Sequence, residues 1–160
     1  MLRNLTIQVI IFFAIFQLLS WFKESSMLER QQSLAEYSFN LPTITGENIS
    51  LVPEKKTVIY FFAPWCSICH ASIDNLQAIY EKHEEINVIA VALDFIETSE
   101  IEDFVSKHQL TFPIAIGNEK VKQAYKVHGY PSYYVINEEN TVISKSIGYS
   151  TELGLYLRSL

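Results

Sequence analysis

Two cysteines, Cys66 and Cys69, directly follow a stretch that favours a buried strand. Residues 57–62, Thr-Val-Ile-Tyr-Phe-Phe, are all β-branched or aromatic, a composition typical of a strand buried on both faces of a parallel sheet. Residues 63–65, Ala-Pro-Trp, interrupt this run, and from Cys69 onward apolar residues recur at helical spacing. The cysteines therefore lie where a buried strand turns into a helix, and this connection constrains the fold more than any other stretch.

The position of the cysteines has a chemical consequence. Unpaired N–H groups and the dipole at a helix N-terminus favour a thiolate, which is the nucleophilic form of cysteine. The two-residue gap places both sulfurs on one turn, close enough to form a disulfide with each other. Cys69 lies one turn deeper than Cys66, in register with Ile73 and Leu76. We therefore expect Cys66 to be the exposed thiol that reacts first and Cys69 to face the core.

The composition narrows the functional classes. The chain has 160 residues, enough for one domain with a substantial core. A net charge of −6 argues against a broad basic face, so no nucleic-acid partner is expected. With only two cysteines, a structural disulfide scaffold is excluded, and a closed zinc site would need two further ligands that no nearby motif supplies. The sequence therefore predicts a redox-active cysteine pair with no metal and no cofactor.

The N-terminal part contains an uncharged apolar run, Leu5 to Phe22. Eighteen helical residues span roughly 27 Å, just enough for the hydrocarbon core of a bilayer. We expect residues 1–22 to form a single-pass anchor in a bacterial inner membrane, with the domain exported to the periplasm. A cleaved signal segment is the alternative, although no small-x-small cleavage site follows the run. Residues 23–36 are predicted to be a polar tether, and residues 37–160 the catalytic domain.

The rest of the pattern predicts an α/β fold. Strands alternate with helices along the chain and a hairpin and helix close it, which favours a mixed sheet flanked by helices on both faces. A β-hairpin over residues 37–51 comes first, and a helix and a strand over residues 99–116 form a central insert, the helix opening on a Ser99–Glu102 capping box. The remaining elements are expected as strands at 87–93, 133–136 and 141–147 and as helices at 121–126 and 151–158.

The motif Trp65-Cys66-Ser67-Ile68-Cys69, together with Tyr130-Pro131 before a strand, resembles the thioredoxin superfamily. In that superfamily a cis-proline begins the strand that faces the dithiol. Pro131 follows Cys66 by 65 residues (131 − 66), more than in plain thioredoxins, and the excess fits the insert. The insert, the hairpin and the anchor together resemble the TlpA/ResA branch of membrane-anchored thiol–disulfide oxidoreductases.

This resemblance implies an enzyme that reduces disulfides of exported envelope proteins. Cys66 and Cys69 are then the catalytic residues and form the redox-active disulfide, while Trp65, Tyr130 and Pro131 contact the substrate. In the family the backbone of the residue at Tyr130 pairs with an extended substrate segment. Trp65 and Tyr130 could equally be packing residues. A membrane reductase is the expected electron donor.

Two positions depart from the family pattern. Thioredoxins have a buried aspartate where this chain has Tyr60, and ResA-like proteins have a glutamate where it has Ser72. Asp94, at the end of the second buried strand, could lie near the dithiol because active sites of such sheets lie at the carboxyl ends of strands. A solvated loop carboxylate is the commoner role for such a residue.

A haem or copper site is the alternative function. Residues 66–70 match the haem-attachment pattern Cys-x-x-Cys-His, in which His70 would be a ligand. A cytochrome would need a mainly helical chain and commonly a distal methionine or histidine, and beyond residue 22 the only methionine is Met27. Copper could be bound by the two thiolates and His128. Strand-rich flanks favour thiol chemistry over both.

Overall fold

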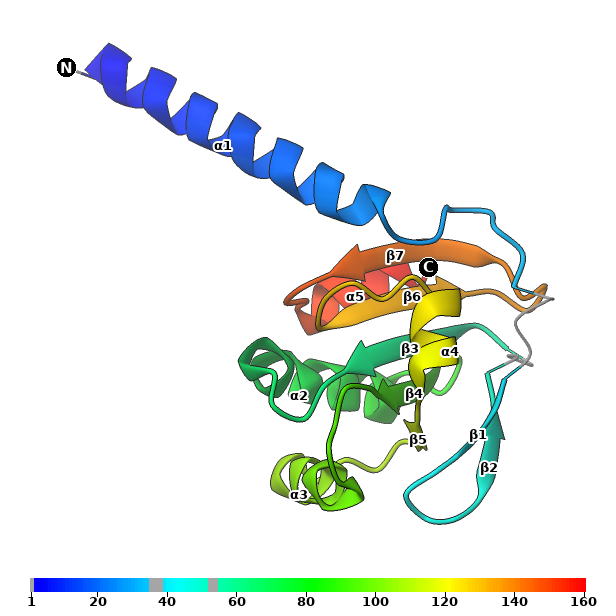
Figure 1. Ribbon diagram of the computed structural model, residues 1–160. Coiled ribbons are helices and arrows are strands. Elements are labelled where there is room, and N and C mark those ends of the chain that lie inside the picture. Colours follow the sequence, from blue (N-terminus) through cyan, green and yellow to red (C-terminus); the bar gives the residue numbers. More distant parts are fainter. Residues whose placement is uncertain (1, 35–38, 52–54) are drawn as a thin grey trace.

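The apolar run that precedes the cysteines forms β3, the central strand of a five-stranded sheet. The computed structural model describes residues 2–34, 39–51 and 55–160, with the backbone alone over 2–6 and 20–23. The strand order is β5-β4-β3-β6-β7, and β3 pairs in parallel with β4 and antiparallel with β6 (Figure 1). The strands are β3 (Thr57–Phe62), β4 (Asn87–Ala92), β5 (Ile114–Ile116), β6 (Ser132–Ile136) and β7 (Val142–Ile147).

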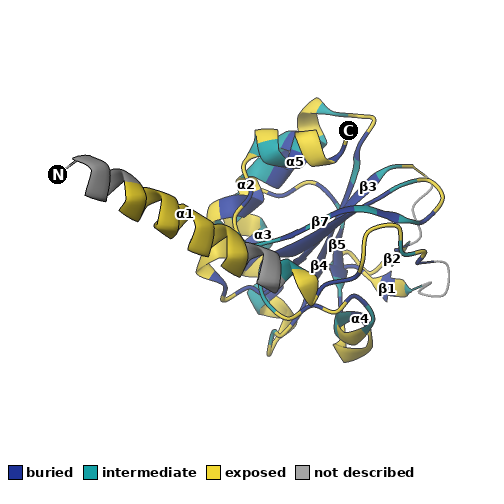
Figure 2. Ribbon diagram, turned by 90° about the horizontal axis from the view of Figure 1, so that it is seen from above, coloured by how far each residue is buried: buried dark blue, intermediate teal, exposed yellow. Residues whose placement is uncertain are grey.

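Both faces of this sheet are covered. Successive residues of each strand point to opposite faces, and each face carries its own buried core cluster. One face packs against α2 (Ser67–Lys82), α3 (Thr98–His108) and α5 (Glu152–Arg158). The opposite face packs against α4 (Glu119–Ala124) and the segment that follows the first helix (Figure 2). The predicted α/β fold, a mixed sheet flanked by helices, is confirmed.

The N-terminal hairpin and the central insert extend the sheet at its β5 edge. The antiparallel hairpin consists of β1 (Asn40–Pro42) and β2 (Asn48–Ser50), and Gly46 adopts a φ of +86° in its turn. An isolated bridge between Thr43 and Ala115 joins the hairpin to the β5 edge. The hairpin predicted over residues 37–51 and the insert of α3 and β5 are thus observed, although residues 37 and 38 lie outside the described part of the chain.

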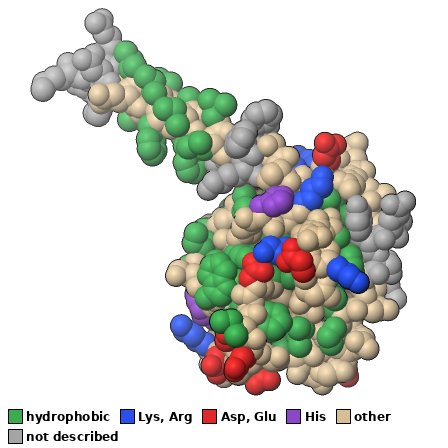
Figure 3. Space-filling view, in the orientation of Figure 1, with side chains coloured by type: hydrophobic (Ala, Val, Ile, Leu, Met, Phe, Trp, Pro, Cys, Tyr) green, Lys and Arg blue, Asp and Glu red, His purple; other side chains and the backbone are tan. Residues whose placement is uncertain are grey.

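The first helix, α1 (Leu2–Ser25), extends away from the domain (Figure 1). Between residues 7 and 19, ten large apolar side chains are exposed to solvent, and hydrophobic side chains are spread along the coloured part of the helix in the space-filling view (Figure 3). Across the residues that the structure describes, no helix is both long and apolar enough to cross a membrane.

The segment after α1 differs from the polar tether predicted over residues 23–36. Its backbone bonds to that of residues 140–142, with the N–H of Leu34 donating to the carbonyl of Asn140 over 2.8 Å. Three of its apolar residues lie in the core cluster on the α4 face of the sheet, namely Met27, Leu28 and Leu34. Isolated apolar residues among polar ones have no regular spacing, so no pattern in the sequence indicates that this segment packs against the sheet.

Two helix starts also differ from the prediction. Helix α3 begins at Thr98 after Glu97, which makes no side-chain cap bond, so the predicted capping box at Ser99 is wrong. Helix α4 begins two residues before the predicted start because the side chain of Asn118 accepts a hydrogen bond from the N–H of Val121 over 3.1 Å.

Candidate active site

The connection from β3 to α2 fixes both cysteines. A tight turn closes when the N–H of Cys66 donates to the carbonyl of Ala63 over 3.0 Å. Cys66 is the N-cap of α2, and its Sγ accepts a hydrogen bond from the N–H of Cys69 over 3.1 Å. The sulfur of Cys66 therefore lies against the unpaired N–H groups of the helix, as the sequence predicts.

The two thiols differ in burial. Cys69 has no exposed surface, while Cys66 keeps 7% of its surface exposed. The predicted exposure of Cys66 is therefore only partial, because its side chain packs into the core cluster that also contains Ala63 and Cys69. Burial raises the pKa of the Cys69 thiol well above its ordinary value, since a buried thiolate loses its hydration, and the adjacent Cys66 thiol raises it further.

A neutral hydroxyl pair lies where relatives are expected to have carboxylates. The hydroxyls of Tyr60 on β3 and Ser72 on α2 are 2.6 Å apart and both residues are buried. Burial, together with the neighbouring thiols of Cys69 and Cys66, raises the pKa of Tyr60 above its ordinary value, although the bond to Ser72 acts in the opposite direction. The pair therefore stays uncharged at neutral pH, and it joins the active-site helix to the central strand.

Pro131 and Tyr130 lie at the same end of the sheet as the cysteines. The Tyr130–Pro131 peptide bond is cis. The pairing of Phe61 with Ser132 places this bond beside the carboxyl end of β3, from which the cysteine turn starts. On the β7 side, the N–H of Gly148 donates a hydrogen bond of 2.7 Å to the carbonyl of Pro131. The structure thus brings Tyr130 and Pro131 to the same end of the sheet as the two cysteines, at the carboxyl end of β3.

Asp94 bonds to both aromatic residues at this end of the sheet, Trp65 and Tyr130. Its carboxylate accepts a hydrogen bond from the Tyr130 hydroxyl over 2.9 Å and pairs with the ammonium of Lys122 over 2.6 Å. Its backbone carbonyl accepts the indole N–H of Trp65 over 2.7 Å. The ion pair is partly exposed, so it contributes only about 0.2–1 kcal/mol to stability. Asp94 therefore bonds to three side chains of the site region, whereas the commoner role expected from the sequence is a solvated loop carboxylate. No pattern in the sequence identifies Lys122 as its partner.

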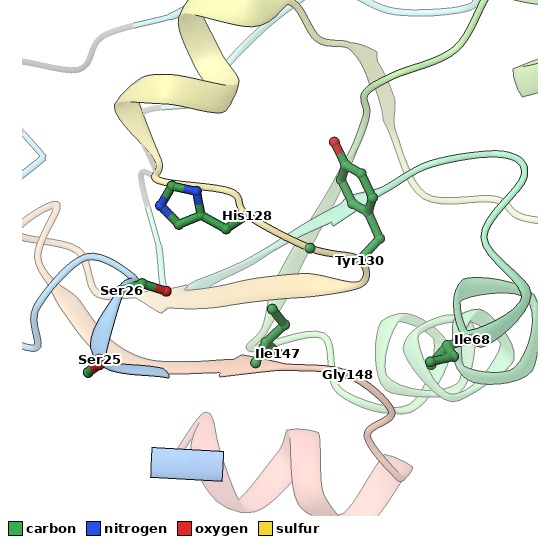
Figure 4. A pocket seen from close by; sticks show the side chains of 8 residues that line it. Ser25, Ser26, Ile68, His128, Tyr130, Ile147 and Gly148 are labelled. Carbon is green, nitrogen blue, oxygen red and sulfur yellow. The ribbon is translucent and has the colours of Figure 1, made fainter. Parts of the chain in front are cut away.

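A cavity of about 460 Å³ opens beside the cis-proline (Figure 4). Ile68, from between the two cysteines, lies on one side of it, and Ile147 of β7 and the ring of Tyr130 lie on others. His128 and the end of α1 complete the lining. Trp65, 63% exposed, lines a second hollow together with His70 and Phe104.

His70 is joined to a chain of polar groups on the surface. Its Nδ1 lies 2.8 Å from Nε2 of His108, whose Nδ1 lies 2.8 Å from a carboxylate oxygen of Asp74. Burial, together with the positive charge of Lys107, lowers the pKa of His70 below its ordinary value. In the part of the chain that the structure describes, no cluster of three or more histidine, cysteine or acidic residues is arranged to hold a metal ion.

With the fold and this geometry established, comparison with known proteins places the chain in a family. The family model for AhpC/TSA proteins matches residues 35–145. The chain belongs to the AhpC/TSA family. Among its relatives, sporulation thiol-disulfide oxidoreductase A of Bacillus subtilis (strain 168) is 28% identical over 145 residues, covering 86% of this chain and 87% of the relative.

A further relative and a solved structure support the resemblance seen in the sequence. Thiol-disulfide oxidoreductase ResA of Bacillus thuringiensis subsp. konkukian (strain 97-27) is 30% identical over 130 residues, which cover 77% of this chain and 75% of ResA. The crystal structure of StoA from Bacillus subtilis has a TM-score of 0.69 at 26% identity, over 76% of this chain and 96% of StoA. The predicted thioredoxin-like fold and the likeness to ResA are therefore confirmed.

The hydrogen bond between Tyr60 and Ser72 in this AhpC/TSA chain should be measurable as a coupling free energy between mutations at the two positions. Replacing Tyr60 with Phe, or Ser72 with Ala, leaves the other hydroxyl buried without its partner, so each change should lower the free energy of unfolding by about 1–3 kcal/mol. The double variant should lose less than the sum, with a coupling of about 1 kcal/mol in urea unfolding. Tyr149→Phe, at an exposed tyrosine, is the control and should cost under about 0.5 kcal/mol. Additive losses would show that the bond contributes nothing.

Proposed function

We propose that this chain is a thiol–disulfide oxidoreductase that reduces disulfides of exported proteins. The observation that supports this most is the asymmetry of the dithiol. Cys66 caps α2 with its sulfur on the free N–H groups and keeps some exposure, whereas Cys69 is fully buried behind it. Negative charge that develops during exchange is favoured at Cys66 and disfavoured at Cys69. Named relatives are thiol-disulfide oxidoreductases.

The reaction follows from this asymmetry. The thiolate of Cys66 attacks one sulfur of a substrate disulfide, the substrate S–S bond breaks, and the departing sulfur takes up a proton. Cys69 then loses its proton and attacks the sulfur of Cys66 in the mixed disulfide. The second substrate thiol departs, and a Cys66–Cys69 disulfide forms. Two electrons pass to the substrate, and a dithiol donor must return them.

Reduction is the proposed direction because the helix N-terminus alone favours a thiolate at Cys66, and no charged side chain between or beside the cysteines adds to it. Strongly oxidising dithiols owe their potential to such stabilisation. Ser67 and Ile68, between the cysteines, carry no charge, and burial lowers the pKa of His70, which favours its neutral form. The Tyr60–Ser72 pair is also neutral. We propose a membrane reductase as the donor and disulfide-bearing envelope proteins as substrates, with Trp65, Tyr130 and Pro131 contacting the substrate segment.

The membrane anchor is part of the same proposal. Its support is the uncharged run from residue 5 to residue 22 and the exposed apolar side chains of α1. With α1 in the bacterial inner membrane, the catalytic domain lies on its periplasmic side, where substrate disulfides form.

Trapping of substrates tests the assigned roles of the thiols. Cys69→Ser removes the resolving thiol, so mixed disulfides with natural partners should accumulate through Cys66 and migrate as heavier, reductant-sensitive bands. Cys66→Ser is the matched control and should trap almost nothing, because its remaining thiol is buried and protonated. Adducts formed mainly by Cys66→Ser would reverse the assignment.

A haem that stays attached after denaturation, seen as a Soret band, would favour the haem alternative through His70 instead.

Fractionation of cells tests the anchor. The full chain should stay with the membrane pellet after washing with alkaline carbonate. Replacing Phe12 and Phe16 of α1 with Lys should release it, since each charge at the middle of a spanning helix costs about 2.5–3.5 kcal/mol. Phe12→Leu with Phe16→Leu is the apolar control and should stay in the pellet. Release of the unaltered chain by carbonate would contradict the proposed anchor.

A further inference from the structure

Asp94 joins the two segments that carry Trp65 and Tyr130 to helix α4. Its carboxylate holds Lys122 of α4 and the hydroxyl of Tyr130, which directly precedes the cis-proline. Its backbone carbonyl holds the indole of Trp65, which directly precedes Cys66. One residue thus contacts both aromatic side chains of the candidate substrate surface, although it lies on neither of their segments.

The backbone around Asp94 is fixed independently of these aromatic side chains. Asp94 has a φ of +50°, a conformation uncommon for a residue with a side chain. The N–H of Leu93, just before it, donates to the carbonyl of Phe62 over 2.8 Å. Gly117 packs so closely that a Cβ there would lie 2.6 Å from Cδ2 of Leu93. The backbone at this strand end is therefore placed by contacts other than those with Tyr130, so the carboxylate of Asp94 is available as an acceptor for the Tyr130 hydroxyl.

The bond to Asp94 determines which part of Tyr130 a substrate meets. Because the hydroxyl donates to the carboxylate, the polar end of the side chain is occupied. The ring contacts Trp65 edge to face, with centroids 5.9 Å apart and planes at 87°. Tyr130 also lines the cavity that contains Ile68 and Ile147. Ile68, Ile147 and the ring of Tyr130 thus form an apolar part of the cavity wall on the side of the cysteine turn, while Ser25, Ser26 and His128 line the rest.

We propose that Asp94 is a positioning residue for substrate specificity, which holds the ring of Tyr130 so that the site selects disulfides with an apolar side chain next to the attacked cysteine. This inference rests on the proposed oxidoreductase function. The reacting sulfurs never touch Asp94, so it acts on the strength of substrate binding and leaves the exchange step itself unchanged. Pre-forming the apolar wall reduces the ordering cost that substrate binding would otherwise carry.

Single-turnover oxidation of the reduced protein separates binding from chemistry. Two synthetic peptides serve as substrates, each with one internal disulfide, and they differ in Leu or Ser beside the attacked cysteine. Oxidised glutathione, a small disulfide without an apolar neighbour, serves as the third substrate. The measured quantities are the limiting rate and the substrate concentration that gives half of it.

Asp94→Ala removes the acceptor of the Tyr130 hydroxyl but keeps the backbone carbonyl that binds Trp65. It should raise the half-saturating concentration of the Leu peptide about tenfold, with the limiting rate and the reaction with oxidised glutathione changed less than about twofold. Asp94→Asn keeps an acceptor oxygen and should restore binding of the Leu peptide to within about threefold of the unaltered protein. Lys122→Met leaves the Tyr130 bond in place and should likewise stay within about threefold.

Tyr130→Phe tests the same bond from its other end, in case Asp94→Ala does not fold, and should also weaken the Leu peptide selectively. Equal preference for the Leu and Ser peptides in the unaltered protein, or an unchanged preference in Asp94→Ala and Tyr130→Phe, would overturn the inference while leaving the oxidoreductase function intact. An Asp94→Asn variant as weak as Asp94→Ala would assign the effect to charge and also overturn it. A reduced protein that none of the three substrates oxidises would overturn the proposed function, and this inference with it.

Discussion

The bond from the N–H of Cys69 to the sulfur of Cys66 is the interaction on which the site depends. It requires that α2 begin directly after Cys66, its N-cap. This helix start depends on the tight turn in which the N–H of Cys66 donates to the carbonyl of Ala63. Placing the sulfur at the helix N-terminus supplies fixed dipoles where charge develops during exchange. The same geometry buries the second thiol one turn further on. A single helix start therefore gives the two thiols different environments.

The groups behind the dithiol are neutral, and this distinguishes the site chemically. Tyr60 and Ser72 satisfy each other's hydroxyls without introducing a charge. The burial that keeps this pair neutral also raises the pKa of Cys69. Deprotonation of Cys69 is therefore the costly part of resolution, and no carboxylate is bonded to it in the described part of the structure to assist. Formation of the mixed disulfide at Cys66 does not carry this cost.

Much of the fold and of the central motif could be predicted from the sequence because those features are local. The strand over residues 57–62 and the helix after the cysteines follow from composition and spacing within a few residues, whereas the cis-proline at Pro131 is implied by the resemblance to the thioredoxin superfamily. The contacts of Asp94 with Lys122 and Tyr130 could not be predicted, since they join residues 28 and 36 positions apart and no local pattern links them. The packed segment over residues 27–34 was missed for a related reason, because its few apolar residues have no regular spacing.

The central claim is that Cys66 is the reactive thiol and Cys69 the protected one. A short pulse of iodoacetamide at neutral pH on the fully reduced protein, followed by peptide mass mapping, measures the two alkylation rates directly. The account predicts that Cys66 is labelled at least about tenfold faster than Cys69, because burial keeps the deeper thiol protonated. Equal rates, or faster labelling of Cys69, would contradict it.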